Sequence, residues 1–154
     1  MSTWRDADLW AKWVRGEDCP ICRSVSTDAA AVELEVSRLM MSEDAPMPGY
    51  AWLAFRRHVI ELHELTEAEG AAFMRDVRRI SRAIAVATGA VKLNYEIHGN
   101  TVPHLHLHIF PRYRGDPFEG RPIRPQSVKT PVYGPGEFDA IRERVVQELS
   151  PRAV

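Results

Sequence analysis

Residues 104–112 read HLHLHIFPR, in which three histidines alternate with aliphatic residues. A period of two predicts a β-strand over residues 104–110, with His104, His106 and His108 on one face. Burying that face would place three imidazoles in the core and expose three large aliphatic side chains, which is the costlier arrangement. We therefore expect the aliphatic face to enter the core and the histidine face to line a cleft or the surface.

The histidine pattern alone is compatible with three kinds of site. The histidines can be surface residues without a function, as on the solvated face of many antiparallel strands. An H-x-H pair on a strand also presents two imidazoles toward one point, as a metal site requires. Catalysis by a neutral imidazole nucleophile, backed by a second imidazole as proton donor, uses the same arrangement. The pattern does not distinguish these interpretations.

The composition indicates a small globular protein without a strong electrostatic field. The chain has 154 residues, 45% hydrophobic and 27% charged, which suits one domain with its own core. A net charge of −1 argues against nucleic acid or acidic lipid as a partner and leaves a small anionic ligand open. The start, MSTWRDADLW, has no export pattern, and the apolar run Ala83–Val91 is too short to span a membrane. We expect the cytoplasm, where Cys19 and Cys22 stay reduced.

Local patterns predict an α+β fold. The stretch TEAE at residues 66–69 is a capping box that begins a long amphipathic helix, and Gly89 ends this helix. Strands without helices between them predict an antiparallel sheet, and neither a repeat nor a linker divides the single domain 1–154. Further helices are predicted over 4–15 and 137–149, strands over 31–41, 50–57, 91–97 and 104–110, a turn at CPIC (19–22) and irregular chain over 111–136.

The sequence GNTVPHLHLHIFPR, at residues 99–112, resembles the signature of the histidine triad nucleotide-binding proteins. Their motif is His-φ-His-φ-His-φ-φ, where φ is apolar. Upstream, PGYAWLAFRRHV (48–59) and ELHELTEAE (61–69) resemble the second strand and the start of the long helix of that family. The connection GN-x-VP before the histidines and the dipeptide PR after the motif resemble those of the bacterial branch of dinucleoside tetraphosphate hydrolase-like proteins.

This resemblance extends over roughly residues 19–112, which would form the domain core. Residues 1–18 would then be a helical extension, and residues 113–154 irregular chain followed by the last helix. The implied architecture is the histidine triad α+β fold, an antiparallel sheet of about five strands with the long helix packed on it. Members of the family usually form homodimers through that helix and the adjacent strand.

The resemblance also implies a reaction. The middle histidine, His106, would attack the α-phosphorus of a nucleotide and form a nucleotidyl-imidazole, which water hydrolyses to a nucleoside monophosphate. Near pH 7 an imidazole is substantially neutral, and a backbone carbonyl bonded to its other nitrogen would fix the tautomer. His108 would contact the phosphate and help to protonate the leaving group. Family substrates are dinucleoside polyphosphates, nucleoside phosphoramidates and adenylates, and the chemistry needs no metal.

Other polar residues match substrate contacts of the family. Asn100 and Thr101 precede the motif, and Asn94 lies on the preceding predicted strand. Each of them can instead be an ordinary turn or surface residue. Tyr50 occupies the place of a fourth histidine that many relatives carry. A tyrosine offers a hydroxyl to a substrate or to a catalytic histidine, but it cannot relay a proton as an imidazole does.

The CPIC pair has a metal-binding interpretation. A redox C-x-x-C normally opens a helix after a strand, whereas this pair follows a predicted helix. Some relatives hold structural zinc with such a pair and two histidines, which implies the ligands Cys19, Cys22, His58 and His104. The alternative is two buried thiols and a surface histidine.

Other functions remain open at the level of sequence. Without the fourth histidine, the chain can be a nucleotide-binding module that does no chemistry. It can also be a zinc-binding scaffold without nucleotide affinity. Within the enzyme class, a phosphorylase would use phosphate instead of water and release a nucleoside diphosphate.

Overall fold

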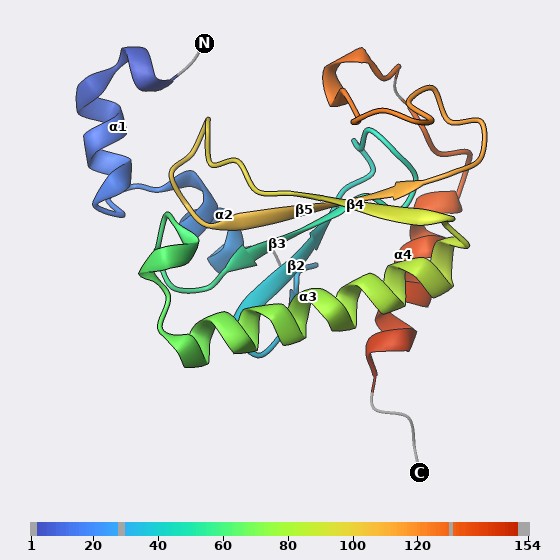
Figure 1. The fold of residues 1–154 in the computed structure, drawn as a ribbon, viewed down its shortest axis with the longest axis horizontal. Helices are drawn as coiled ribbons and strands as arrows, with labels where there is room; N and C mark the ends of the chain where they lie inside the picture. Colours follow the sequence, from blue (N-terminus) through green and yellow to red (C-terminus); the bar gives the residue numbers. More distant parts are fainter. Residues whose placement is uncertain (1–2, 28–29, 130, 151–154) are drawn as a thin grey trace. The chain divides into compact units, whose positions relative to one another are not determined.

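A computed structural model describes residues 3–27, 30–129 and 131–150, and Figure 1 shows their helices and strands. Short 3₁₀ helices lie at Thr3–Arg5, Leu62–Glu64 and Pro125–Ser127. The α-helices are α1 (Ala7–Val14), α2 (Pro20–Thr27), α3 (Glu67–Thr88) and α4 (Glu137–Leu149), and the strands are β1 (Val32–Glu33), β2 (Ser37–Met41), β3 (Ala51–Phe55), β4 (Lys92–Glu96) and β5 (His106–Arg112).

In the described part of the chain, five strands form one antiparallel sheet in the order β1-β2-β3-β5-β4. The end of β3 meets the start of β5, since the Phe55 N–H donates to the Leu105 carbonyl over 3.0 Å. The start of β4 meets the end of β5, since the Val91 N–H donates to the Arg112 carbonyl over 2.9 Å. The predicted α+β class with an antiparallel sheet is confirmed, and β5 has a neighbouring strand on each side.

Contacts within the chain define two compact units, each built from separate segments. The prediction of a single domain over residues 1–154 stays a prediction. The first unit comprises Met1–Met40, Trp52–Val77 and Glu96–Leu107, and the second comprises Met41–Ala51, Arg78–Tyr95 and His108–Val154.

In the first unit, the beginning of α3 packs against β3. The buried rings of Phe73 and Phe55 meet edge to face, with centroids 5.6 Å apart. The predicted capping box is present: the Thr66 hydroxyl accepts the Glu69 N–H over 3.2 Å, and the Glu69 carboxylate accepts the Thr66 N–H over 3.0 Å. Local sequence therefore determines where α3 begins, and apolar burial determines the face it turns to the sheet.

The predicted strand over residues 31–41 is wrong in its middle, where the chain turns between β1 and β2. The cause is the buried carboxylate of Asp76 on α3. It accepts the N–H groups of Glu35, Val36 and Ser37 over 3.0–3.1 Å and the Ser37 hydroxyl over 2.7 Å. These bonds satisfy backbone donors that a continuous strand would offer to a neighbouring strand.

In the second unit, the end of α3 packs against α4. Ile80 and Ile84 of α3 are fully buried, and the Arg79 guanidinium donates to the Leu149 carbonyl at the end of α4. The predicted helix over residues 137–149 is confirmed at both bounds. The α4 side chains that enter the core recur at helical spacing: Ile141, Val145 and Leu149.

Three local predictions are corrected by the structure. CPIC is not a turn, because α2 begins at Pro20 and contains Cys22. Proline suits that position, since the first helical N–H has no partner within the helix. The strand predicted over residues 104–110 runs instead from His106 to Arg112, so part of the predicted irregular segment is strand.

Arg112, at the end of β5, organises the chain that follows. Its buried guanidinium pairs with Asp116, donates to the carbonyls of Phe118 and Arg121, and donates to the Asn94 side chain over 2.9 Å. The planar Arg112 guanidinium has five N–H donors, and their hydrogen bonds hold this loop in the absence of regular secondary structure.

Replacing Asp76 by alanine is expected to destabilise the protein strongly. The variant leaves three backbone N–H groups near β1 and β2 without their acceptor, and the free energy of unfolding should fall by about 3 kcal/mol. Urea unfolding followed by circular dichroism measures the loss. The neighbouring Arg75→Ala change, which removes an exposed ion pair with Glu35, is the matched control and should have little effect. Equal losses in the two variants would contradict this role of Asp76.

Candidate functional site

His104 lies just before β5 and is fully buried, whereas the histidine face was expected to line a cleft or the surface. Its Nε2 lies 2.7 Å from the Phe55 carbonyl oxygen. Because a carbonyl only accepts hydrogen bonds, Nε2 carries the proton and Nδ1 carries the lone pair. Burial, with smaller effects from His58 and His106, lowers the pKa of His104 to about 4. A neutral ring with a lone pair at Nδ1 is the form that binds a metal ion.

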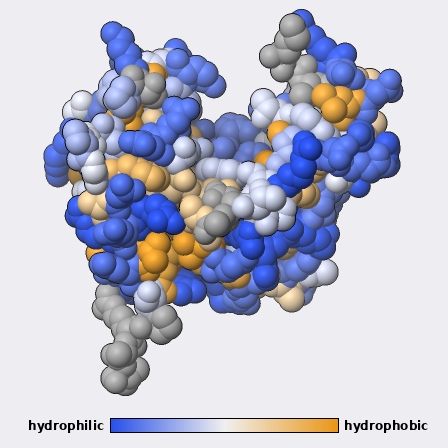
Figure 2. All heavy atoms as spheres, turned by 180° about the vertical axis from the view of Figure 1, so that it is seen from behind, coloured by the Kyte–Doolittle hydropathy of each residue, from blue (hydrophilic) through white to orange (hydrophobic). Residues whose placement is uncertain are grey.

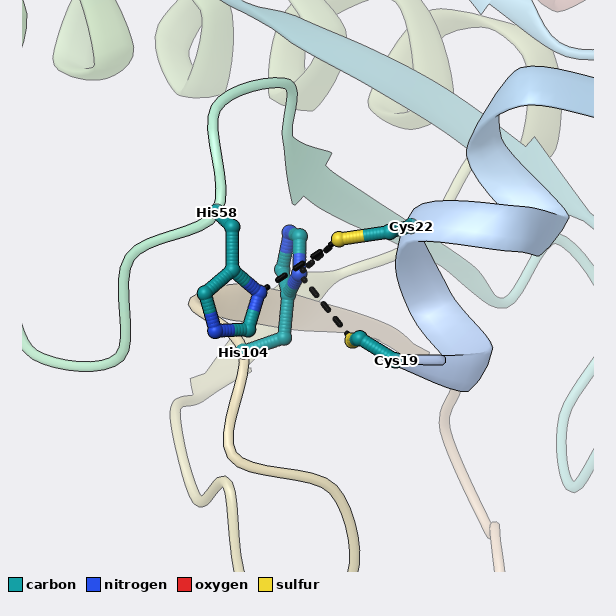
Figure 3. Close-up of side chains that lie close together, drawn as sticks. All are labelled: Cys19, Cys22, His58 and His104. Carbon is teal, nitrogen blue, oxygen red and sulfur yellow. Dashed lines mark hydrogen bonds between the residues drawn. The ribbon is translucent and has the colours of Figure 1, made fainter. Parts of the chain in front are cut away.

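The predicted metal ligands come together around that lone pair (Figure 3). The His104 Nδ1 lies 3.6 Å from the Cys19 Sγ and 3.4 Å from the Cys22 Sγ. The His58 Nδ1 lies 3.4 Å from the Cys22 Sγ. All four ligand atoms lie within 4.8 Å of one another. The cysteines come from the start of α2, and the histidines follow β3 and precede β5.

This geometry fits a tetrahedral zinc ion. With Zn–S bonds of about 2.3 Å and Zn–N bonds of about 2.0 Å, sulfur and nitrogen ligands stand about 3.5 Å apart. A hydrogen-bonded alternative is weaker, because one lone pair on His104 faces two sulfur atoms. His58 repeats the arrangement of His104, since its Nε2 lies 3.2 Å from the Val14 carbonyl and its Nδ1 faces Cys22. Carbonyls that orient metal-binding imidazoles are a common feature of such sites.

The Cys22 thiol is protonated in the metal-free geometry. Burial first, and then the neighbouring Cys19, raise the pKa of the Cys22 thiol to about 12. Binding a metal cation would reverse this preference, because thiolate is the ligand, and protons would be released. Zinc would therefore bind more weakly as the pH falls.

His106 has the opposite tautomer to His104. Its Nδ1 lies 2.6 Å from the His104 carbonyl oxygen, so Nδ1 carries the proton and Nε2 the lone pair. Burial is the main cause that lowers the pKa of His106 below its ordinary value, and nearby His98 lowers it further. The expected fixing of the tautomer by a backbone carbonyl is confirmed. His106 is therefore a neutral imidazole near pH 7 whose lone pair lies on Nε2.

Trp52 was not identified from the sequence as a neighbour of His106. Its ring meets His106 edge to face, with centroids 6.0 Å apart. Residues 50 and 52 share a face of the strand by alternation, so the position of Tyr50 was the signal that could have identified Trp52.

His108 is half-buried and contacts Tyr50. The Tyr50 hydroxyl lies 2.7 Å from the His108 Nδ1, and the ring planes are within 16° of each other. Phe110 lies beside both rings, with its centroid 4.9 Å from that of Tyr50 and 6.0 Å from that of His108. The residue that replaces the fourth histidine is thus in contact with the last histidine of the motif.

The residues predicted to contact phosphate lie in different surroundings. Asn100 and Thr101 are exposed in the segment between β4 and β5. The Asn94 side chain instead accepts a hydrogen bond from Arg112. Substrate binding by these three residues stays a prediction.

Hydrophilic and hydrophobic residues are unevenly distributed over the face of the molecule in Figure 2. Hydrophilic residues predominate on the face in Figure 2, and hydrophobic residues form separate patches. Within the described ranges, none of the helices combines the length and the apolar character needed to cross a bilayer. Exposed large apolar residues include Met74 and Val86 on α3, Tyr95 on β4 and Ile97 just after it.

The fold has solved counterparts. A histidine triad protein from Bradyrhizobium japonicum superimposes with a TM-score of 0.68 and 29% identity, covering 79% of this chain and 92% of that one. A zinc-bound histidine triad family protein from Mycobacterium smegmatis has a TM-score of 0.62 and 24% identity, covering 84% and 94%. The second likeness supports the fold alone.

Curated relatives include proteins named for action on nucleotides. The adenosine 5'-monophosphoramidase of Schizosaccharomyces pombe is 27% identical over 120 residues, which are 72% of this chain and 90% of that protein. The asymmetrical bis(5'-nucleosyl)-tetraphosphatase of the same yeast is 33% identical over 75 residues, which are 46% of this chain and 41% of that protein. The AP-4-A phosphorylase of Mycobacterium tuberculosis is 33% identical over 76 residues, which are 45% and 38%.

The family assignment follows from the domain match. Residues 23–115, more than half of the chain, match the HIT domain, and this span contains all three histidines of the motif. The five-stranded sheet agrees with the solved histidine triad structures. The chain belongs to the HIT domain family.

Proposed function

We propose that this protein is a nucleotidyl hydrolase or transferase that cleaves a nucleotide at its α-phosphate and releases a nucleoside monophosphate. The observation that carries the proposal is the buried hydrogen bond from the His106 Nδ1–H to the His104 carbonyl. It gives His106 a neutral ring and a lone pair at Nε2, which is what a nucleophile toward phosphorus needs.

In the proposed reaction, the His106 Nε2 attacks the α-phosphorus as the bond to the leaving group breaks. Water then attacks the nucleotidyl-histidine and returns His106 to its starting form. His106 and His108 are two residues apart on β5, so their side chains extend from the same face of the strand. His108 would therefore be in a position to donate a hydrogen bond to the phosphoryl group or the leaving group.

The names of the relatives point to several classes of substrate. They include a phosphoramidase, a tetraphosphatase and a phosphorylase. The chain spans less than half of the last two proteins, so the phosphoramidase is the relative matched over nearly its whole length. Dinucleoside polyphosphates, phosphoramidates and adenylates all remain candidates, with water or phosphate as the acceptor.

We propose structural zinc at Cys19, Cys22, His58 and His104. The matching separations of the ligand atoms support it. Zinc would neutralise the thiolates and tie α2 to the backbone around β5. Catalysis would not use it, because the attacking group is an imidazole.

We propose that the protein forms a homodimer and that it works in the cytoplasm. The exposed Met74, Val86 and Tyr95 on α3 and β4 support the dimer, since large apolar side chains at these positions gain by burial against a second copy. A reducing compartment keeps Cys19 and Cys22 reduced, as zinc binding requires.

The His106→Ala variant is expected to lose turnover entirely. The assay follows release of nucleoside monophosphate from diadenosine tetraphosphate, diadenosine triphosphate and adenosine phosphoramidate. His63→Ala, which removes an exposed histidine outside the motif, is the control and should retain wild-type rates. Product analysis with added phosphate separates the acceptors, because a phosphorylase yields a nucleoside diphosphate. Nucleotide binding without turnover by the wild type would instead support a binding module.

Zinc should be present at about one ion per chain and should be lost from Cys22→Ala, because three ligands hold it less tightly than four. Elemental analysis of the purified protein measures the content. A chelator should also lower the unfolding temperature of the wild type and leave that of Cys22→Ala unchanged. The exposed His63→Ala variant should keep its zinc. Full zinc content in Cys22→Ala would refute the site.

Light scattering should give a mass of about twice 17.5 kDa for the wild type. Val86→Glu should shift the protein toward the monomer, because a charge would be buried in the contact. Leu62 is also exposed but lies outside α3 and β4, so Leu62→Glu is the control and should remain dimeric. A monomeric wild type would rule out the proposed assembly.

A further inference from the structure

Tyr50 is held in place by the backbone before it. Gly49 has a φ of +76°, and a Cβ there would lie 2.4 Å from the Thr88 Cγ2 on α3. The Gly49 N–H donates to the buried hydroxyl of Tyr133 over 2.9 Å. The Tyr113 hydroxyl donates to the Pro48 carbonyl over 2.7 Å. Two further tyrosines thus fix the chain that carries Tyr50.

The Tyr50 ring is also restrained. It packs against Phe110 in a cluster whose buried members include Met47 and Phe118. These packed neighbours restrict the ring, so its hydroxyl is held 2.7 Å from the His108 Nδ1. Such rigidity is what a residue needs if it is to set the orientation of a catalytic side chain.

The bond between Tyr50 and His108 has two possible directions. A phenol donates readily near neutral pH, since its ordinary pKa is about 10. If Tyr50 donates to Nδ1, neutral His108 carries its proton on Nε2, the other ring nitrogen. If Tyr50 accepts, the proton lies on Nδ1 and Nε2 has no proton to offer an anionic phosphoryl oxygen. Only the first direction makes neutral His108 a hydrogen-bond donor to substrate.

We propose that Tyr50 is a positioning residue that donates its hydroxyl proton to the His108 Nδ1 and so makes His108 a fixed Nε2–H donor, and that this pair favours anhydride substrates over phosphoramidates. The inference rests on the proposed function and narrows its substrate class.

The preference for anhydrides follows from whether the leaving group must gain a proton. When His106 attacks a dinucleoside polyphosphate, an N–P bond forms, a P–O bond breaks, and the phosphate leaving group departs as a stable anion. When it attacks a phosphoramidate, a P–N bond breaks and the departing amine must gain a proton. That proton would come from the His108 Nε2, and Nδ1 would then take the Tyr50 proton and leave a phenolate. A phenol gives up its proton less readily than an imidazolium ion does, so this route is slow.

Two substitutions at position 50 test the proposal. Tyr50→Phe removes the hydroxyl and keeps a ring against Phe110, so kcat should fall about ten-fold with KM little changed. Tyr50→His restores a group that relays protons, so the ratio of the anhydride rate to the phosphoramidate rate should fall about ten-fold or more. His63→Ala removes an exposed side chain outside the motif and is the control, with wild-type kinetics.

The nitrogen-15 NMR spectrum of the imidazoles gives a readout independent of activity. His108, identified by the signals missing from His108→Gln, should carry its proton on Nε2 in the wild type and in His63→Ala. In Tyr50→Phe the two tautomers should mix.

The outcomes separate the two levels of the hypothesis. A proton on the His108 Nδ1 in the wild type would overturn the assignment of Tyr50 as donor. An unchanged rate ratio in Tyr50→His would overturn the substrate preference. If the wild type releases no nucleoside monophosphate from any substrate, the proposed function fails together with the preference, and the NMR result still decides the direction of the hydrogen bond.

Discussion

Carbonyl oxygens accept hydrogen bonds and never donate them, and two such oxygens organise the histidines of this protein. The Phe55 carbonyl accepts a hydrogen bond from the His104 Nε2–H, which leaves the lone pair on Nδ1 facing the cysteines. The His104 carbonyl accepts a hydrogen bond from the His106 Nδ1–H, which leaves the lone pair on Nε2. Phe55 also donates its own N–H to Leu105, so the pairing of β3 with β5 holds this arrangement together.

The same use of polar side chains and backbone recurs through the core. The buried polar residues of the described chain include Asp76 and Arg112, and each binds backbone of an irregular segment. Within the described ranges, no buried side-chain nitrogen or oxygen lacks a hydrogen-bond partner. Buried charge in this fold therefore shapes turns and loops that apolar packing alone would leave unspecified.

Features encoded by neighbouring residues were predictable from the sequence. The capping box at Thr66 and the apolar spacing of α4 predicted helices that the structure contains. The turn between β1 and β2 was not predictable, because its acceptor, Asp76, lies 39 residues after Ser37. Alternation likewise suggested an exposed histidine face and did not reveal that β5 begins only at His106, after a fully buried His104.

The candidate site was predictable only in part. Family resemblance named Cys19, Cys22, His58 and His104, and their side chains do come together. Spacing alone could not have done so, since Cys19 and His104 are 85 residues apart. The contact between Tyr50 and His108 joins residues 58 apart and depends on which strands are neighbours. Such pairings are set by sheet topology, which no local pattern reports.

His104 contributes to two neighbouring groups of side chains, to one through its imidazole and to the other through its backbone carbonyl. The cysteines face its imidazole, whereas His106 needs only its carbonyl, which every amino acid supplies. Descendants of this chain can therefore lose the candidate metal ligand at position 104 while the acceptor for the next histidine persists. The candidate metal site and the His106 site are adjacent in space, yet substitutions can remove the first in evolution and leave the second.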